Sequence, residues 1–118
     1  RFALRRLYAR YHLPIMITEN GWSARETLTE DGRVHDQERI HYFEEMVKAM
    51  SDAIDDGVEL FSFNPWSFID LLSSSQGMDK RYGMVFVDRT NDDLKELKRY
   101  KKDSFYYYQQ VIKETTGK

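Results

Sequence analysis

The chain has 118 residues, of which 41% are hydrophobic and 32% charged, and its formal net charge is −2 at pH 7. These values are typical of one compact globular domain, and the balanced charge leaves neither a basic surface for nucleic acid nor a polybasic patch for a membrane. Because cysteine is absent and no run of about 18 apolar residues occurs, the sequence excludes disulfides, thiol catalysis, thiolate metal sites and a membrane-spanning helix.

The first third of the chain predicts a helix, a strand and a long loop. In residues 2–11 the apolar side chains fall on one helical face: Leu4, Leu7, Tyr8 and Tyr11. No N-cap precedes this helix, so we expect the chain to begin inside a longer protein. Residues 13–18, LPIMIT, form a continuous apolar run, which is typical of a strand buried on both faces. The polar stretch 20–35 is longer than most connections, and such loops are often functional.

A second helix and a second strand are predicted next. Asp36 is a suitable N-cap, and Gly57 suits the position after the last turn. Between them, apolar residues recur at steps of three and four: Ile40, Phe43, Val47, Met50 and Ile54. Residues 58–63, VELFSF, predict the second strand, and residues 64–83 form a second long loop.

The last third of the chain predicts a short strand over residues 84–87 and a final helix that begins at Asp103 or Ser104. The side chains expected to face inward from this helix are Phe105, Tyr108 and Ile112. We interpret the basic run 94–102, LKELKRYKK, as a solvated turn before the helix.

The alternation of helices and strands predicts an α/β fold with a parallel sheet. Two solid strands make a poor free-standing sheet, so the chain is either a very small α/β domain or a slice of a larger (β/α)₈ barrel, which typically takes about 250 residues. Both long loops follow the C-terminal ends of strands, where barrel enzymes place their chemistry.

Side chains just past the two strands are candidates for that chemistry. Glu19 stands at the end of the first strand, before Asn20-Gly21, and is either a nucleophile, base or ligand, or a carboxylate that merely caps or pairs at the start of the loop. Trp66 follows the second strand and could stack on a sugar, although its position alone favours a core or rim role. Asp70 either binds a ligand or ties down its own loop, and we favour the second role.

The second long loop carries hydroxyl groups and cations: Ser73, Ser74, Ser75, Lys80, Arg81 and Tyr82. A phosphate monoester is bound by such donors and one compensating charge, although serine runs and Lys-Arg pairs are also common in plain surface loops. No Walker pattern is present, so no nucleotide is implied. The three histidines lack ligand spacing, and we expect neither a metal nor a cofactor.

The motifs ITENG, NPWSFID and KRYG occur in this order, and through them the chain resembles the C-terminal quarter of glycoside hydrolase family 1, the retaining β-glycosidases with a TIM-barrel fold. The similarity runs from RYHLPIMITENG through DGRVHDQERIHYFEEMVKAM to LKRYKKDSFYYY, and it is greatest to the 6-phospho-β-glucosidases. The resemblance implies that residues 1–118 are the C-terminal fragment of a single barrel domain, about its last two β/α units.

The resemblance also implies roles for individual residues. Glu19 matches the catalytic nucleophile, which forms a glycosyl-enzyme ester that water then hydrolyses. Trp66 matches a residue that contacts the sugar in the −1 subsite. The residues that match the phosphate-binding set of phospho-glycosidases are Ser73, Lys80 and Tyr82. Ser73 stands where enzymes for unphosphorylated sugars carry a sugar-binding Glu, and Ser74 favours a gluco over a galacto substrate.

By this resemblance we expect a cytoplasmic β-glycosidase that hydrolyses a phosphorylated disaccharide or aryl glucoside, without a cofactor and without nucleic-acid or membrane partners. The alternatives are a 6-phospho-β-galactosidase, a broad β-glucosidase and, from another class, a non-catalytic α/β module that binds a phosphorylated ligand. The acid/base Glu of the family lies in an upstream NEP motif that this sequence lacks. We therefore expect the 118 residues alone to be inactive.

Overall fold

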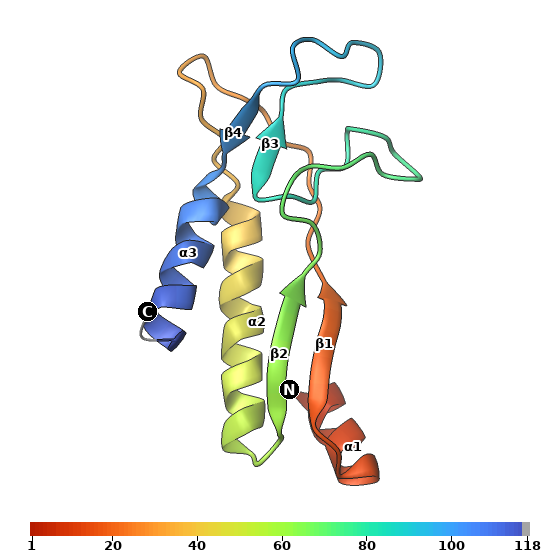
Figure 1. Ribbon diagram of the computed structural model, residues 1–118, viewed down its shortest axis with the longest axis vertical. Helices are drawn as coiled ribbons and strands as arrows, with labels where there is room; N and C mark the ends of the chain where they lie inside the picture. Colours follow the sequence, from red (N-terminus) through yellow and green to blue (C-terminus); the bar gives the residue numbers. More distant parts are fainter. Residues whose placement is uncertain (117–118) are drawn as a thin grey trace.

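The structure is a computed structural model that describes residues 1–116. Its elements are, in chain order, α1 (Phe2–Tyr11), β1 (Ile15–Asn20), α2 (Gln37–Asp55), β2 (Leu60–Pro65), β3 (Val85–Val87), β4 (Arg99–Lys101) and α3 (Asp103–Thr116). Figure 1 shows β1, β2 and α2 side by side in the lower part of the molecule, while β3, β4 and the long loops lie beyond the C-terminal ends of β1 and β2.

The ends of the helices α1 and α2 follow the sequence signals. α1 ends at Tyr11 and is capped by His12, which adopts a left-handed conformation with φ of 50° and donates its N–H to the carbonyl of Tyr8 at 2.8 Å. α2 begins after Asp36 and is followed by Gly57, whose φ of +92° is the left-handed conformation that glycine adopts without strain. The expected helix boundaries are therefore confirmed.

The strands β1 and β2 pair in parallel, as the alternation of elements predicts. Ile15 lies opposite Leu60 and Asn20 opposite Pro65, so the C-terminal ends of both strands meet at the same edge. Each strand lies two residues further along the chain than the apolar runs suggest. One reason is that Pro14 has no N–H, so the first ladder bond near this end is made by Ile15, which donates to Glu59 at 2.8 Å.

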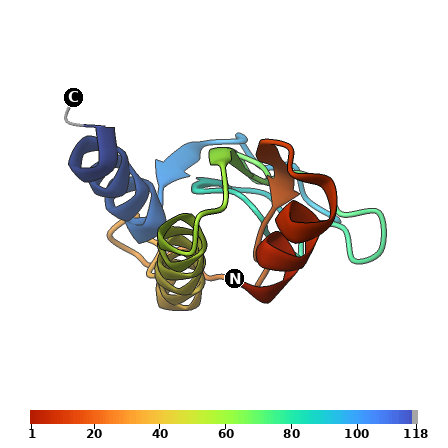
Figure 2. The same cartoon turned by 90° about the horizontal axis from the view of Figure 1, so that it is seen from below.

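The expectation that the first strand is buried on both faces is wrong for this chain. Met16 keeps 47% of its surface exposed, and Phe61 on the neighbouring strand keeps 67%. The physical reason is the small sheet: β1 and β2 pair only with each other among the described residues, and Figure 2 shows α1 and α2 on the same side of this pair.

A strand that sequence reasoning missed lies in the basic run before the last helix. β4 pairs antiparallel with β3, with Val85 opposite Lys101 and Val87 opposite Arg99. The solvated-turn interpretation of residues 94–102 is therefore wrong for its last part, and Lys102 is fully buried. Basic residues on both sides of Tyr100 hid the alternation by which a strand is recognised.

Most of the buried apolar side chains gather between α2, α3 and the β3–β4 pair: Val34, Phe43, Met84, Val85, Phe86 and Val87. The rings of Phe43 and Tyr108 are 5.3 Å apart and join α2 to α3. Ile54 and Ile112 were expected to face a core, but they are 50% and 46% exposed, because they line an open groove between α2, β2 and α3.

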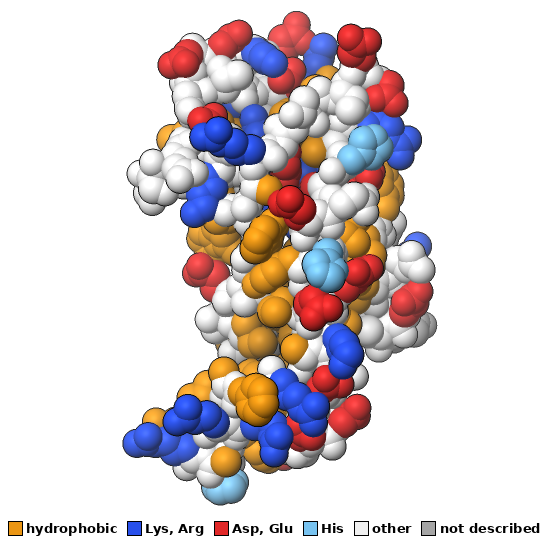
Figure 3. All heavy atoms as spheres, turned by 180° about the vertical axis from the view of Figure 1, so that it is seen from behind, with side chains coloured by type: hydrophobic (Ala, Val, Ile, Leu, Met, Phe, Trp, Pro, Cys, Tyr) orange, Lys and Arg blue, Asp and Glu red, His pale blue; other side chains and the backbone are white. Residues whose placement is uncertain are grey.

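Seen from behind, hydrophobic side chains form a band along the middle of the molecule, and Lys and Arg side chains gather at the lower end around α1 (Figure 3). Within residues 1–116, no helix is long and apolar enough to cross a membrane.

Candidate active site

The C-terminal edge of the parallel pair carries two of the candidate residues. Glu19 is the penultimate residue of β1 and is exposed, and Trp66 directly follows β2 with 42% of its surface exposed. The backbone N–H of Trp66 donates to the carbonyl of Asn20 at 2.7 Å. The ladder between the two strands therefore fixes the backbones that carry the carboxylate and the indole next to each other.

Gly21 explains the Asn-Gly pair that follows Glu19. A Cβ atom at Gly21 would lie 2.9 Å from the Cβ atom of Trp66, which is closer than real side chains approach. A glycine is therefore needed for the chain to pass so close to Trp66 as it leaves β1.

Two aromatic residues support this edge from the side of α2. The Tyr42 hydroxyl donates to the side-chain oxygen of Asn20 at 2.5 Å. The ring of Tyr42 stacks on that of Trp22, with centroids 5.5 Å apart and planes 29° apart. The segment after Glu19 is thus tied to α2 through both Asn20 and Trp22.

The structure brings Ser73, Lys80 and Tyr82 together, as expected for a common anion site. Hydrogen bonds from Ser73 and Lys80 lower the pKa of the Tyr82 hydroxyl below its usual value. The Lys80 ammonium lies 5.5 Å from the centroid of the Tyr82 ring. These side chains form a cluster of one cation and two hydroxyls, which is a suitable arrangement of donors for a phosphate group.

Ser73 is held in place by a tight turn. It exchanges two backbone hydrogen bonds with Gly77, at 2.9 and 3.1 Å, and is only 7% exposed. Its side-chain oxygen accepts the backbone N–H groups of Ser75 and Gln76 at 3.3 and 3.4 Å. Ser74, in contrast, is exposed.

Beneath these loops lies a network of buried charged side chains, which sequence reasoning did not predict: Glu26, Asp36, Arg39, Asp70, Arg81 and Lys102. Their side chains are at most 7% exposed. Three are cations and three are carboxylates, so the formal charges cancel. Such pairing is the condition under which charges are tolerated in a protein interior.

Asp70 lies at the centre of one half of this network. It accepts hydrogen bonds from Arg81 at 2.9 Å, from Lys102 at 2.7 Å and from the backbone N–H of Gly83 at 3.0 Å. These contacts support the interpretation that Asp70 ties down its own loop. A close approach of this kind also explains Gly83, where an added Cβ atom would lie 2.3 Å from the backbone N of Asp70.

Glu26 and Asp36 hold Arg39 in the other half. Arg39 is 1% exposed, donates from Nε to Asp36 at 2.9 Å and also pairs with Glu26, which in turn contacts Lys102. Burial raises the pKa of Glu26, although the charges of Lys102 and Arg39 oppose this effect. Asp36 also accepts the N–H of Ser104 at 2.9 Å and so caps the start of α3 instead of its own helix.

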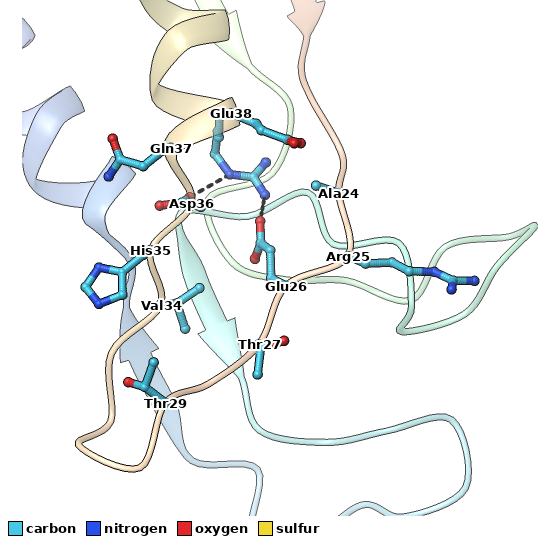
Figure 4. A pocket seen from close by; sticks show the side chains of 11 residues that line it. Ala24, Arg25, Glu26, Thr27, Thr29, Val34, His35, Asp36, Gln37 and Glu38 are labelled. Carbon is cyan, nitrogen blue, oxygen red and sulfur yellow. Dashed lines mark hydrogen bonds and ion pairs between the residues drawn. The ribbon is translucent and has the colours of Figure 1, made fainter.

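A cavity of about 400 Å³ lies on the outer side of Glu26 and Asp36, and its rim includes Thr27, His35 and Glu38 (Figure 4). Neither Glu19 nor Trp66 is among its lining residues. Within residues 1–116, no group of three or more His, Asp or Glu side chains is arranged to hold a metal ion.

Comparison with known proteins places these residues in a family. The sequence profile of glycosyl hydrolase family 1 matches residues 1–117. The chain is 50% identical over 119 residues to aryl-phospho-beta-D-glucosidase BglA of Bacillus subtilis, covering 99% of this chain and 25% of that protein. It is 42% identical over 113 residues to 6-phospho-beta-glucosidase AscB of Escherichia coli, covering 95% of this chain and 24% of that protein.

A solved structure agrees with the sequence matches. The family 1 β-glucosidase from Thermotoga maritima superposes with a TM-score of 0.85 at 37% identity, covering 95% of this chain and 24% of that one. The chain therefore spans about a quarter of the length of the curated relatives that it matches.

Proposed function

Because the chain belongs to glycosyl hydrolase family 1, we propose that it is the C-terminal part of a retaining β-glycosidase that hydrolyses 6-phospho-β-glucosides in the cytoplasm. Residues 1–118 would form about the last two β/α units of a single (β/α)₈ barrel. The parallel β1–β2 pair, with long loops after both C-terminal strand ends, supports this assignment. The activity would be that of the whole protein.

The observation that carries the proposal is the position of Glu19 beside Trp66, with the Ser73, Lys80 and Tyr82 cluster in a neighbouring loop. A backbone bridge joins the two loops, since Ala24 and Arg81 exchange hydrogen bonds at 3.1 and 3.0 Å. A sugar placed on Trp66 would therefore have a carboxylate near its reacting carbon, with one cation and two hydroxyl donors within the same site.

In the proposed mechanism the Glu19 carboxylate attacks the anomeric carbon while the glycosidic oxygen leaves with a proton, and a glycosyl-enzyme ester forms. Water then attacks the ester, so the configuration is retained. The proton donor is a second carboxyl group, which retaining enzymes place about 5–5.5 Å from the nucleophile. We assign it to a part of the protein outside these residues, and we expect the 118 residues alone to be inactive.

The phosphate at O6 of the sugar would bind to Ser73, Lys80 and Tyr82. Lys80 supplies the compensating charge, and the two hydroxyls supply neutral donors. A serine at position 73 places no anion there, so a phosphate is not repelled. Ser74 favours a gluco over a galacto substrate, and so does the similarity to BglA and AscB, which are both phospho-β-glucosidases.

The test compares kcat/KM of the full-length protein on a chromogenic β-glucoside with and without the 6-phosphate. Charge-assisted hydrogen bonds contribute roughly 1.5–3 kcal/mol, so Lys80→Ala should lose about tenfold to a hundredfold on the phosphorylated substrate and little on the other. Lys98→Ala, which removes an exposed lysine paired with Glu96, is the control.

An equal loss of kcat/KM on both substrates would mean that Lys80 supports the structure of the loop and does not bind the phosphate. A wild-type preference for the unphosphorylated glucoside would favour a broad β-glucosidase, and binding of the phosphorylated sugar without turnover would favour a non-catalytic binding module.

A further inference from the structure

We propose that Arg39 is a positioning residue that fixes the spacing between the strand end carrying Glu19 and the loop carrying Lys80 and Tyr82. The proposal rests on the function proposed above, because it assigns the nucleophile and the phosphate site to these two segments. Arg39 itself is buried and touches neither the sugar nor the phosphate in this scheme.

All five N–H donors of the Arg39 guanidinium are used. Nε donates to Asp36 at 2.9 Å, and one terminal nitrogen pairs with Glu26. The remaining donors reach three backbone carbonyls: those of Trp22 at 2.5 Å, Tyr82 at 2.8 Å and Arg81 at 3.2 Å. Because the guanidinium is planar and rigid, these acceptors are held in one fixed arrangement.

One terminal nitrogen of Arg39 donates to the carbonyls of both Trp22 and Tyr82, which belong to the two segments that carry the proposed nucleophile and the proposed phosphate site. Trp22 follows Glu19 by three residues, and Tyr82 is itself a member of the phosphate cluster. The two carboxylates Asp36 and Glu26 orient the guanidinium at the start of α2. Both loops are therefore anchored by hydrogen bonds to a single rigid group on α2.

Tyr42 makes a second tie from the same helix. It lies three residues after Arg39 and therefore on the same helical face. Its hydroxyl donates to Asn20, the residue directly after Glu19, and its ring stacks on Trp22. α2 thus holds the segment after Glu19 at two points, and Arg39 alone of the pair also holds the Tyr82 loop.

The spacing matters for a substrate that carries the phosphate and the reacting carbon on one sugar. Binding of the phosphate lowers the barrier only if it also places the anomeric carbon on the nucleophile, and a misplacement of about 1 Å can cost about a hundredfold in rate. Loosening the Arg39 contact should therefore leave phosphate binding in place but uncouple it from catalysis.

The test uses Arg39→Lys in the full-length protein, because lysine keeps the charge but cannot reach all five acceptors. We measure kcat and KM on the chromogenic glucoside with and without the 6-phosphate, and the inhibition constant of glucose 6-phosphate. The ratio of the two kcat/KM values should fall at least about tenfold, mainly through kcat on the phosphorylated substrate, while the inhibition constant changes by less than about threefold.

Val58→Ala is the control for lost stability. Val58 is buried at the far end of α2 and β2, away from both loops, so its truncation should lower stability and leave the ratio unchanged. If Arg39→Lys does not fold, Glu26→Gln is used in its place: it keeps the shape of the side chain but removes the charge that orients the Arg39 guanidinium, and the ratio should fall about threefold.

A ratio that stays at the wild-type value in Arg39→Lys, or in Glu26→Gln if that variant must be used, would overturn the positioning role and leave the proposed function intact. A wild-type enzyme without any preference for the phosphorylated glucoside would refute the proposed function and the positioning role together.

Discussion

Replacing Lys102 by methionine removes an ammonium group that two buried carboxylates share. Lys102 is fully buried, donates to Asp70 at 2.7 Å and contacts Glu26. The substitution turns a network of three cations and three carboxylates into one with a net charge of −1. Removing one partner of a buried ion pair typically costs about 3–5 kcal/mol, because the remaining charge stays desolvated. We expect a loss of that size in the free energy of unfolding.

The assay is urea denaturation of the full-length protein followed by circular dichroism, with a matched double variant. Lys102→Met combined with Glu26→Gln again has equal numbers of buried cations and carboxylates, so it should recover at least half of the loss. A cost below about 1 kcal/mol for the single variant, or a double variant no more stable than the single one, would refute the view that charge balance holds these loops together.

Further predictions concern titration and exposed surface. Hydrogen bonds from Ser73 and Lys80 lower the pKa of Tyr82. The difference in phenolate absorbance between wild type and Tyr82→Phe should therefore rise at lower pH than the absorbance of free tyrosine does, and glucose 6-phosphate should reverse this shift. No effect of the ligand would argue against a phosphate beside Tyr82. Burial raises the pKa of Glu26 in the folded state, so ionisation of this side chain opposes folding. The stability of the wild type relative to Glu26→Gln should therefore be greatest below the unfolded pKa of Glu26 and decline as the pH rises through its folded pKa. Urea denaturation from acid to neutral pH measures this difference, and a difference that grows with pH would contradict the reasoning. The isolated 118-residue chain should bind a hydrophobic dye and associate, since Met16, Phe61 and Phe68 are 47%, 67% and 61% exposed; a monomeric, sharply cooperative thermal transition would contradict this.

The sequence was most informative where local chemistry decides the structure. Pro14 and Gly57 mark a strand start and a helix end, and the apolar runs predict a parallel pair whose C-terminal ends carry Glu19 and Trp66. The expected gathering of Ser73, Lys80 and Tyr82 in one cluster also agrees with the structure, although their roles stay predictions.

The features that were missed depend on contacts between distant segments. Lys102 stands in a basic run that is typical of a solvated surface, and its burial follows only from Asp70 and Glu26, which lie on two other loops. Arg39 looks like an ordinary polar residue in the first turn of a helix, and only the folded chain brings the carbonyls of Trp22 and Tyr82 to it. The strand β4 was hidden by its charged composition, because its single partly buried residue, Tyr100, gives no alternation to detect.

Covalent trapping tests the assignment of Glu19 most directly. A 2-fluoro β-glucoside 6-phosphate with a good leaving group should inactivate the full-length protein and form a stable ester, because the fluorine slows hydrolysis of the glycosyl-enzyme intermediate. Peptide mapping should locate the label on Glu19, and Glu19→Gln should abolish both the label and turnover. A label on another residue, or an undiminished label in Glu19→Gln, would contradict the assignment.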